Sequence, residues 1–486
     1  MRWLGIEWDQ GPEVGGPNGP YLQSQRRDIY DKYIKKLLDE KKAYYCFDTP
    51  EELDALRREA EARKKNFIYP RPEKFPGEKD VEKMRAEGRP VTVRFAIPRQ
   101  KSIVVTDVVR GEVTFAAGEM SDFIIQKSNG FPTYNFACVV DDYLMKVTHV
   151  IRGQEHLMNT PGQQELWKAL GFGQLPTYVH MSVTVSEGGG KLSKRERPRA
   201  LRNAIKNVCD IDLRKLVEAG NITPGEFNNF VAGKTIPDMS NIDAMAEYLG
   251  IQLPEINVVD FFNGGYLPEA MVNFLALLGW SPGGKREIML VDELIECFDL
   301  SRLAKSNSLF DRKKLLAFNT EHIRMVSKEK LLGYFKSYLK AIESPAISAD
   351  DELLAKIIKA CEGARTLGDI ERKSRFLFIP DDQIEYDDKA VRKVLLKNDG
   401  LAVLQIVRDR LAAIEPCNKE NNENMLRGLA EEKQVGLGKI AQPLRVAICG
   451  TTISLPIFDS VEMLGKENTL SRIDNTLKKY ETKPQI

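Results

Sequence analysis

The chain has 486 residues, of which 42% are hydrophobic and 29% charged, and its formal net charge is +1. This length is too great for one hydrophobic core, so we expect three or four domains of a soluble globular protein. No apolar run approaches the roughly 20 residues that span a membrane, and residues 1–6 do not resemble a signal peptide. The seven cysteines form no C-x-x-C pair, which argues against zinc or a disulfide framework. We therefore expect no membrane association and a reducing, cytoplasmic location.

Residues 1–39 lack a recognisable N-terminal strand. Several turn formers lie between Gly11 and Gly19. The stretch GPYLQSQR, residues 19–26, then leads into a helix predicted over 28–39. Composition alone favours a surface loop that caps this helix.

Residues 40–133 are predicted to form an α+β domain. Strand patterns cover residues 91–97, 102–109 and 123–126. A helix is predicted to begin after Thr49, with Pro50 at its first position and Glu52 closing a capping box.

Residues 134–196 alternate between apolar runs and one helical pattern. Strands are predicted over residues 136–140, 146–152 and 178–185, and a helix over 160–170. Strand, helix, strand is the pattern of a parallel doubly wound sheet. Ligands of such sheets bind at the carboxyl ends of the strands, where Arg152, Glu155 and Lys194 would lie.

A basic loop follows the last of these strands. Glycines 188–190 precede Lys191, and residues 191–206 carry seven Lys or Arg against one acid, Glu196. Such a run is most often a solvated surface, but it also suits a polyphosphate or a nucleic-acid backbone.

The rest of the chain reads as helices. Residues 197–255 contain short helical patterns that end at Pro254. Pro268 and Gly279 frame an apolar helix, and residues 326–486 show apolar stripes at helical spacing.

Three motifs make this sequence similar to one family. The stretches VIRGQEH (150–156), GKLSKR (190–195) and GYLPEA (265–270) resemble the bacterial-type glutamyl-tRNA synthetases, which are class I aminoacyl-tRNA synthetases. The resemblance implies an α/β doubly wound, incomplete Rossmann-like catalytic domain with an α+β insertion, followed by all-α C-terminal domains. The implied domains are the remnant of the first half of the catalytic domain (1–39), an acceptor-end-binding insertion (40–133), the second half of the catalytic domain (134–196), a lineage-specific helical insert (197–255), a stem-contact domain (256–325) and an anticodon-binding domain (326–486).

The resemblance also implies a glutamate–tRNA ligase that uses ATP and Mg²⁺, acts on tRNA(Glu) and L-glutamate, and is a monomer. Mobile cations stabilise the charge that develops on the phosphates in the transition state. Lys191 and Lys194 match the two catalytic cations of the family. The implied ATP contacts are Lys194, Glu155, His156 and Ser193; the glutamate contacts are Arg152, Tyr134 and Cys138; the tRNA contacts are Arg365 and Arg195.

Some of these positions have an alternative structural explanation. Tyr134 could be a core aromatic residue, Arg365 a solvated arginine at a helix end, and His156 a packing residue on the adenine side. Cys138 stands where relatives often have asparagine. Cys46 is followed by Asp48 where some relatives begin a zinc site with Cys-x-Cys, so we expect no zinc.

The family's first signature, a "HIGH"-like motif, is not found around any of the four histidines, 149, 156, 180 and 322. Two explanations stay open: a translation start further upstream, or a truncated paralogue that binds tRNA without forming the adenylate. A glutamyl-queuosine-type enzyme is disfavoured because that group lacks the helical C-terminal domain.

Overall fold

The computed structural model describes residues 1–193, 195–207, 212–397 and 399–481. The chain divides into two compact units. The first comprises Met1–Lys191, Ala276–Glu287 and Asp292–Phe310, and the second comprises Leu192–Leu275, Ile288–Val291 and Asp311–Ile486. No helix in the described part of the chain is both long and apolar enough to cross a membrane.

The first unit contains a three-stranded antiparallel sheet in the order β1-β2-β5. Its strands are β1 (Ala43–Cys46), β2 (Thr92–Phe95) and β5 (Phe123–Gln126), and the helices of this region are α1 (Arg27–Asp39), α2 (Pro50–Ala62) and α3 (Glu78–Ala86). The predicted capping box of α2 is confirmed: Thr49 accepts from the Glu52 amide, and the Glu52 side chain accepts from the Thr49 amide.

A second, four-stranded sheet has the order β4-β3-β7-β6. Its strands are β3 (Ile103–Asp107), β4 (Gly111–Phe115), β6 (His149–Gly153) and β7 (Thr177–Met181). β7 pairs in parallel with both β6 and β3, whereas β3 and β4 are antiparallel. The sheet is therefore mixed, and it crosses the predicted boundary at residues 133 and 134, because β3 and β4 come from the predicted insertion.

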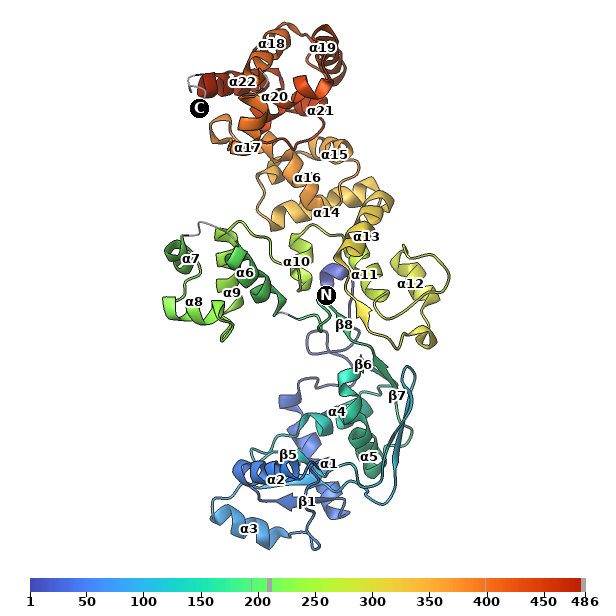
Figure 1. Cartoon of the computed structure of the whole chain (residues 1–486). Helices are drawn as coiled ribbons and strands as arrows, with labels where there is room; N and C mark the ends of the chain where they lie inside the picture. The colour runs from blue at the N-terminus through green and yellow to red at the C-terminus, as the bar shows by residue number, and fades with distance from the viewer. Residues whose placement is uncertain (194, 208–211, 398, 482–486) are drawn as a thin grey trace. The chain divides into compact units, whose positions relative to one another are not determined.

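One predicted strand is wrong. Residues 136–140 lie inside a helix, α4 (Tyr134–Leu144), and not in a strand. A short apolar run does not distinguish a buried strand from a buried helix, and here Phe136, Ala137, Val139 and Val140 are all buried at helical spacing. Figure 1 shows α4 and α5 (Thr160–Leu170) beside β6 and β7.

The predicted strand over residues 178–185 is divided in two. The first part, β7, ends at Met181. The second part, β8 (Thr184–Val185), pairs in parallel with β9 (Ser308–Leu309). The helix predicted over residues 160–170 is confirmed as α5.

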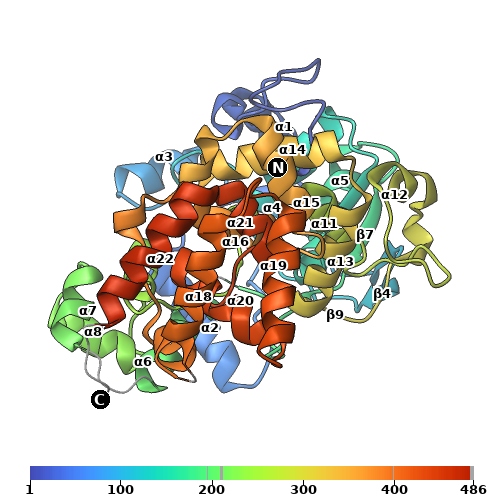
Figure 2. The same ribbon diagram turned by 90° about the horizontal axis from the view of Figure 1, so that it is seen from above.

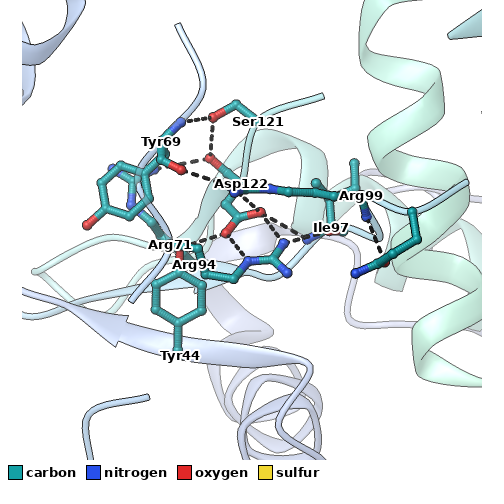
Figure 3. Close-up of polar contacts among 9 residues, drawn as sticks. Tyr44, Tyr69, Arg71, Arg94, Ile97, Arg99, Ser121 and Asp122 are labelled. Carbon is teal, nitrogen blue, oxygen red and sulfur yellow. Dashed lines mark hydrogen bonds and ion pairs between the residues drawn. The ribbon is translucent and has the colours of Figure 1, made fainter. Parts of the chain in front are cut away.

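A buried polar cluster joins the strands of the first sheet (Figure 3). The Asp122 side chain is fully buried and accepts hydrogen bonds from the Tyr44 hydroxyl at 2.8 Å and from the Ile97 amide at 3.2 Å. Arg71 donates to both of its carboxylate oxygens, at 2.7 and 2.6 Å, and Arg99 lies 3.3 Å away. Every face of this carboxylate is thus satisfied within the protein.

Cys46, at the position where some relatives begin a zinc site, contacts three neighbouring side chains. Its Sγ lies 2.8 Å from an Asp48 oxygen and 3.1 Å from the Tyr69 hydroxyl, and it accepts from Arg94 Nε at 3.3 Å. The Arg94 guanidinium also stacks 3.8 Å from the centre of the Tyr69 ring. The absence of zinc stays a prediction.

The second unit is helical in its described part. The predicted insert holds α6 (Glu196–Asn207), α7 (Leu213–Ala219), α8 (Pro224–Val231) and α9 (Met239–Tyr248). The next region holds α10 (Val258–Asn263), α11 (Pro268–Ala276), α12 (Val291–Cys297) and α13 (Arg312–Met325), of which α12 lies mostly in the first unit.

The C-terminal helices share one continuous hydrophobic core. They are α14 (Lys328–Ala341), α15 (Asp351–Ala360), α16 (Leu367–Ser374), α17 (Asp388–Ala390), a π-helical turn (Val391–Leu395), α18 (Gly400–Ala413), α19 (Lys419–Glu432), α20 (Leu437–Cys449), α21 (Ile457–Leu464) and α22 (Lys466–Glu481). α22 packs on α18 and α20 (Figure 2). The all-α C-terminal region is confirmed.

The GYLPEA motif has a packing role in this unit. Gly265 has a φ of +78°, and a Cβ there would lie 2.4 Å from the Gly368 amide nitrogen, so only glycine fits. The buried Glu269 carboxylate accepts from Lys330 at 2.5 Å and from Tyr334 at 2.6 Å. The motif therefore ties α11 to α14 and α16.

Candidate active site

The end of β6 carries Arg152, whose guanidinium is held by side chains from two other elements. Its Nη2 donates to Thr160 Oγ1 and to Gln163 Oε1 of α5, each at 2.8 Å, and its Nε donates to His180 Nε2 of β7 at 3.1 Å. None of these bonds uses Nη1. A charged fork held in this way is oriented before any ligand arrives, and one terminal nitrogen is still available to a carboxylate.

His180 and Asp107 stand behind Arg152. Both side chains are fully buried, and His180 Nδ1 donates to Asp107 Oδ2 at 2.6 Å. Burial lowers the pKa of His180, although the Asp107 carboxylate opposes the shift. The imidazole is therefore neutral, and its Nε2 is free to accept from Arg152.

These supporting residues were not found from the sequence. His180 lies on β7, Asp107 on β3, and Thr160 and Gln163 on α5, so no local pattern joins them. The one available signal was a buried histidine within an otherwise apolar strand.

The α4 helix presents three polar side chains at a spacing of four residues: Tyr134, Cys138 and Asp142. The Tyr134 side chain is 51% exposed, and both the Cys138 thiol and the Arg152 guanidinium lie within electrostatic reach of its hydroxyl. Positions four apart share one helix face. Tyr134 is therefore not the core aromatic that was the alternative, and α4 brings it together with Cys138 beside Arg152.

Burial changes the acidity of this face. The pKa of Asp142 is raised to about 6 because its carboxyl is buried, and the nearby Arg152 cation only partly offsets this. Burial likewise raises the pKa of the Cys138 thiol, and the Asp142 charge adds to the effect. Perturbed carboxyl groups of this kind gather at functional sites more often than elsewhere.

His156 contacts both Tyr134 and Arg152. Its ring lies 5.9 Å from that of Tyr134, between centroids, and its backbone carbonyl accepts from Arg152 Nη2 at 3.4 Å. The structure thus brings together four of the predicted residues, Arg152, Tyr134, Cys138 and His156.

The start of the basic loop contacts Glu155. Lys191 Nζ lies 2.7 Å from Glu155 Oε1, and this hydrogen bond lowers the pKa of the carboxyl. Both side chains are largely exposed, at 63% and 45%, so a polyanion could displace the pair at little cost. Lys194, the second predicted cation, lies outside the described residues.

The Arg26 side chain of the GPYLQSQR stretch supports α4 from the other side. Arg26 is 1% exposed; its Nε donates to Asp141 at 2.8 Å and its Nη1 to the Pro20 carbonyl at 2.6 Å. Tyr30 of α1 donates to the same carboxylate. The stretch is therefore more than a surface loop, because it anchors the residue next to Asp142.

The remaining predicted contacts, Ser193, Arg195 and Arg365, belong to the second unit. The Ser193 carbonyl accepts from the Glu196 amide at 3.1 Å where α6 begins, and Arg195 is exposed just before that helix. Arg365 is exposed before α16, at a hollow of about 600 Å³ that Tyr266, Tyr338 and Arg372 also line. Its backbone carbonyl accepts from Asn319, so its position is fixed while its side chain faces solvent.

Comparisons with known proteins agree on one family. Residues 1–219 and 255–317 match the model of the class I tRNA synthetase catalytic domain (E and Q), and residues 330–477 match an anticodon-binding domain. The chain is 34% identical to the glutamate–tRNA ligase of Moorella thermoacetica over 98% of this chain and 85% of that protein. It is 33% identical to that of Bacillus subtilis, over 98% and 87%. The crystal structure of a glutamate tRNA ligase from Elizabethkingia meningosepticum in complex with its amino acid superimposes with a TM-score of 0.71 and 31% identity, over 98% and 87% of the two chains.

Proposed function

Because the chain belongs to the class I tRNA synthetases of the E and Q group, we propose that it is a glutamate–tRNA ligase. It would activate L-glutamate with ATP and transfer the glutamyl group to the 3′ end of tRNA(Glu). The observation that carries this proposal is the Arg152 guanidinium, held by Thr160, Gln163 and His180 next to the half-exposed Tyr134.

The chemistry assigns a role to each part of the site. A glutamate side-chain carboxylate would bind Arg152 Nη1 and the Tyr134 hydroxyl, with Cys138 lining the same face. Lys191 would leave Glu155 to meet the triphosphate as the α-phosphate is attacked and pyrophosphate departs, and Lys194 would do so by resemblance. Glu155, His156 and Ser193 would contact ATP.

Mg²⁺ would enter with the nucleotide, bound to its phosphates. No group of three His, Cys, Asp or Glu side chains in the described part of the chain could form a metal site, so the phosphates would be its main ligands. Arg195 and Arg365 would contact tRNA. Arginine recognises unpaired bases by hydrogen bonding and stacking. We also propose that the protein acts as a monomer in the cytoplasm.

The test is ligation of radiolabelled glutamate, glutamine or aspartate, each supplied alone, to a tRNA(Glu) transcript by this chain. We expect labelled tRNA with glutamate alone. As much labelled tRNA with glutamine as with glutamate would contradict the assignment of Arg152 to the side-chain carboxylate, because glutamine has a neutral amide there. Equal labelling with aspartate would contradict the choice of glutamate as the substrate.

A second candidate is a tRNA-binding paralogue without ligase activity. It is favoured by the absence of a "HIGH"-like motif around the four histidines. Two of them, His180 and His322, are fully buried and hydrogen-bonded. Tight binding of tRNA(Glu) without ligation or ATP–pyrophosphate exchange would establish this second function instead.

A further inference from the structure

The helical insert is a small module with a hydrophobic core of its own. Buried side chains from all four helices form this core: Leu201, Ile205, Leu216, Phe227, Phe230, Ile242, Met245, Ala246 and Leu253, the last just after α9. α6 and α7 both pack on α9, and the four helices form one group in Figure 1. Because the insert itself supplies this core, the side chains on the outer faces of these helices are not part of it.

One face of α6 is uniformly basic. Arg195, immediately before the helix, is followed by Arg199, Arg202 and Lys206, at a spacing of four, three and four residues. At about 100° per residue these four lie within an arc of roughly 60°. The buried residues of α6, Pro198, Leu201 and Ile205, lie on a neighbouring side of the helix, centred roughly 100° away from the basic face.

The carboxylates near α6 are engaged elsewhere. Arg197, which is not on the basic face, is 2.8 Å from Asp243 and 3.3 Å from Asp260. Glu196 is 3.6 Å from Arg312. By contrast, none of the four cations on the basic face makes an ion pair with another described residue. Exposed ion pairs contribute little to stability, so these four cations can stay solvated in the folded module and are available to an anionic ligand.

Arg202 shows how the face is held in place. Its guanidinium lies 5.5 Å from the centre of the Phe230 ring of α8, so a cation–π contact holds it in place. Arg199 and Lys206, on either side of it, are exposed.

We propose that the basic face of α6 is an additional binding surface for the sugar–phosphate backbone of tRNA. The four cations extend over about 16 Å of helix, at 1.5 Å per residue, which matches several successive phosphates of one strand. Side chains of this kind bind phosphates without reading bases, so the surface would add affinity and not sequence preference. This inference rests on the proposed function, because it takes tRNA as the ligand.

The test is the double variant Arg199→Gln/Lys206→Gln in the full chain. Dissociation constants for a tRNA(Glu) transcript are measured by filter binding between 50 and 400 mM KCl. Each phosphate that is no longer neutralised should reduce the slope of log K against log salt by about 0.7 to 0.9. We expect a reduction of about 1.5 in slope and a loss of about 5- to 10-fold in affinity at 100 mM KCl.

A matched control is available in the same module. Arg214→Gln/Lys234→Gln removes the same charge from two other exposed positions, and Arg199→Lys/Lys206→Arg keeps the charge of the basic face. Both should bind tRNA within twofold of wild type. Equal losses in the two glutamine variants, or an unchanged slope in Arg199→Gln/Lys206→Gln, would overturn the inference while the wild-type chain still ligates glutamate. A wild-type chain that binds no tRNA would overturn the proposed function as well.

Discussion

Two carboxyl groups of the first unit, one fully and one partly buried, show how differently this fold treats charge. Asp122 has no exposed side-chain surface, and Tyr44, Arg71, Arg99 and the Ile97 amide surround it (Figure 3). Asp142 is only partly buried, it makes no side-chain hydrogen bond to another described residue, and its pKa is raised to about 6.

The difference separates a structural cluster from a candidate site. A carboxylate whose lone pairs are all filled holds strands together and offers nothing to a ligand. A carboxyl that lacks hydrogen bonds beside an incompletely used guanidinium is poorly solvated and is poised to respond to a ligand. Charge density alone therefore does not identify a site; unfilled hydrogen-bonding capacity does.

The largest effect on the candidate site around Arg152 should come from Arg152→Gln. We expect kcat/KM for glutamate to fall about 1000-fold, which corresponds to about 4 kcal/mol, because a charged fork to a carboxylate is replaced by a neutral amide. Steady-state ligation kinetics measure this. Arg152→Lys, which keeps the charge without the fork, should fall in between; an unchanged KM for glutamate in both variants would contradict the assignment.

The structural cluster around Asp122 should respond in the opposite way: a substitution there should lower stability and leave the KM for glutamate unchanged. Asp122→Asn leaves Arg71 and Arg99 without their buried counter-charge, so we expect the free energy of unfolding to fall by about 3 kcal/mol. The midpoint of urea denaturation measures this loss. The KM for glutamate should not change at urea concentrations below the unfolding transition. A variant that lost activity but kept its stability would contradict the assignment of Asp122 to a structural role.

Lys191→Ala tests the loop cation of the site. We expect kcat to fall about 100-fold, or about 2.7 kcal/mol, because a cation that meets the phosphates in the transition state is removed. Stability should stay the same, since the pair with Glu155 is exposed. Lys168→Ala, which removes a lysine paired with Glu165 at 2.7 Å, is the control and should keep full activity.

A smaller effect is expected for the pH dependence of stability. The folded protein holds the Asp142 proton more tightly than the unfolded chain does, because its pKa is raised from 3.8 to about 6. Wild type should therefore lose stability as the pH rises from about 4 through 6. Asp142→Asn should remove this loss and gain about 1 to 2 kcal/mol over wild type at pH 8, with little gain near pH 4. Urea denaturation at several pH values measures the difference, and an equal effect at all pH values would refute the cause.

The smallest effect should come from Cys138→Asn. Burial raises the pKa of this thiol, so it stays protonated and contributes no charge, and an amide of similar size should fit the same face of α4. We expect kcat/KM for glutamate to change less than threefold. A loss of tenfold or more would show that Cys138 contacts the substrate directly.

Patterns within a few residues predicted much of the fold. The α2 capping box, the bounds of α5 and β5, and the helical C-terminal region all followed from caps and periodicity. The strand predicted over residues 136–140 failed because burial on all sides hides the period of a short element. The division of residues 178–185 into β7 and β8 was missed because β8 pairs with β9, more than 120 residues away.

The candidate site was predicted in part. Family motifs located Arg152, Tyr134, Cys138, His156, Glu155 and Lys191, and the structure places these six in the first unit, in two groups. Lys194 lies outside the described residues, and the roles of Ser193, Arg195 and Arg365 stay predictions. Asp142 was passed over because an acid at the end of an apolar run looks like an ordinary solvated boundary.

Neighbours along the chain were enough to set where many helices begin and end, which family motifs are present and where the basic residues concentrate. Packing was needed to show that His180 and Asp107 hold Arg152, that Arg26 anchors Asp141, and that the four cations of the basic face make no ion pair with another described residue. These contacts join residues far apart in sequence or depend on how an element is packed. Burial then decides which charges are satisfied and which are available to a ligand.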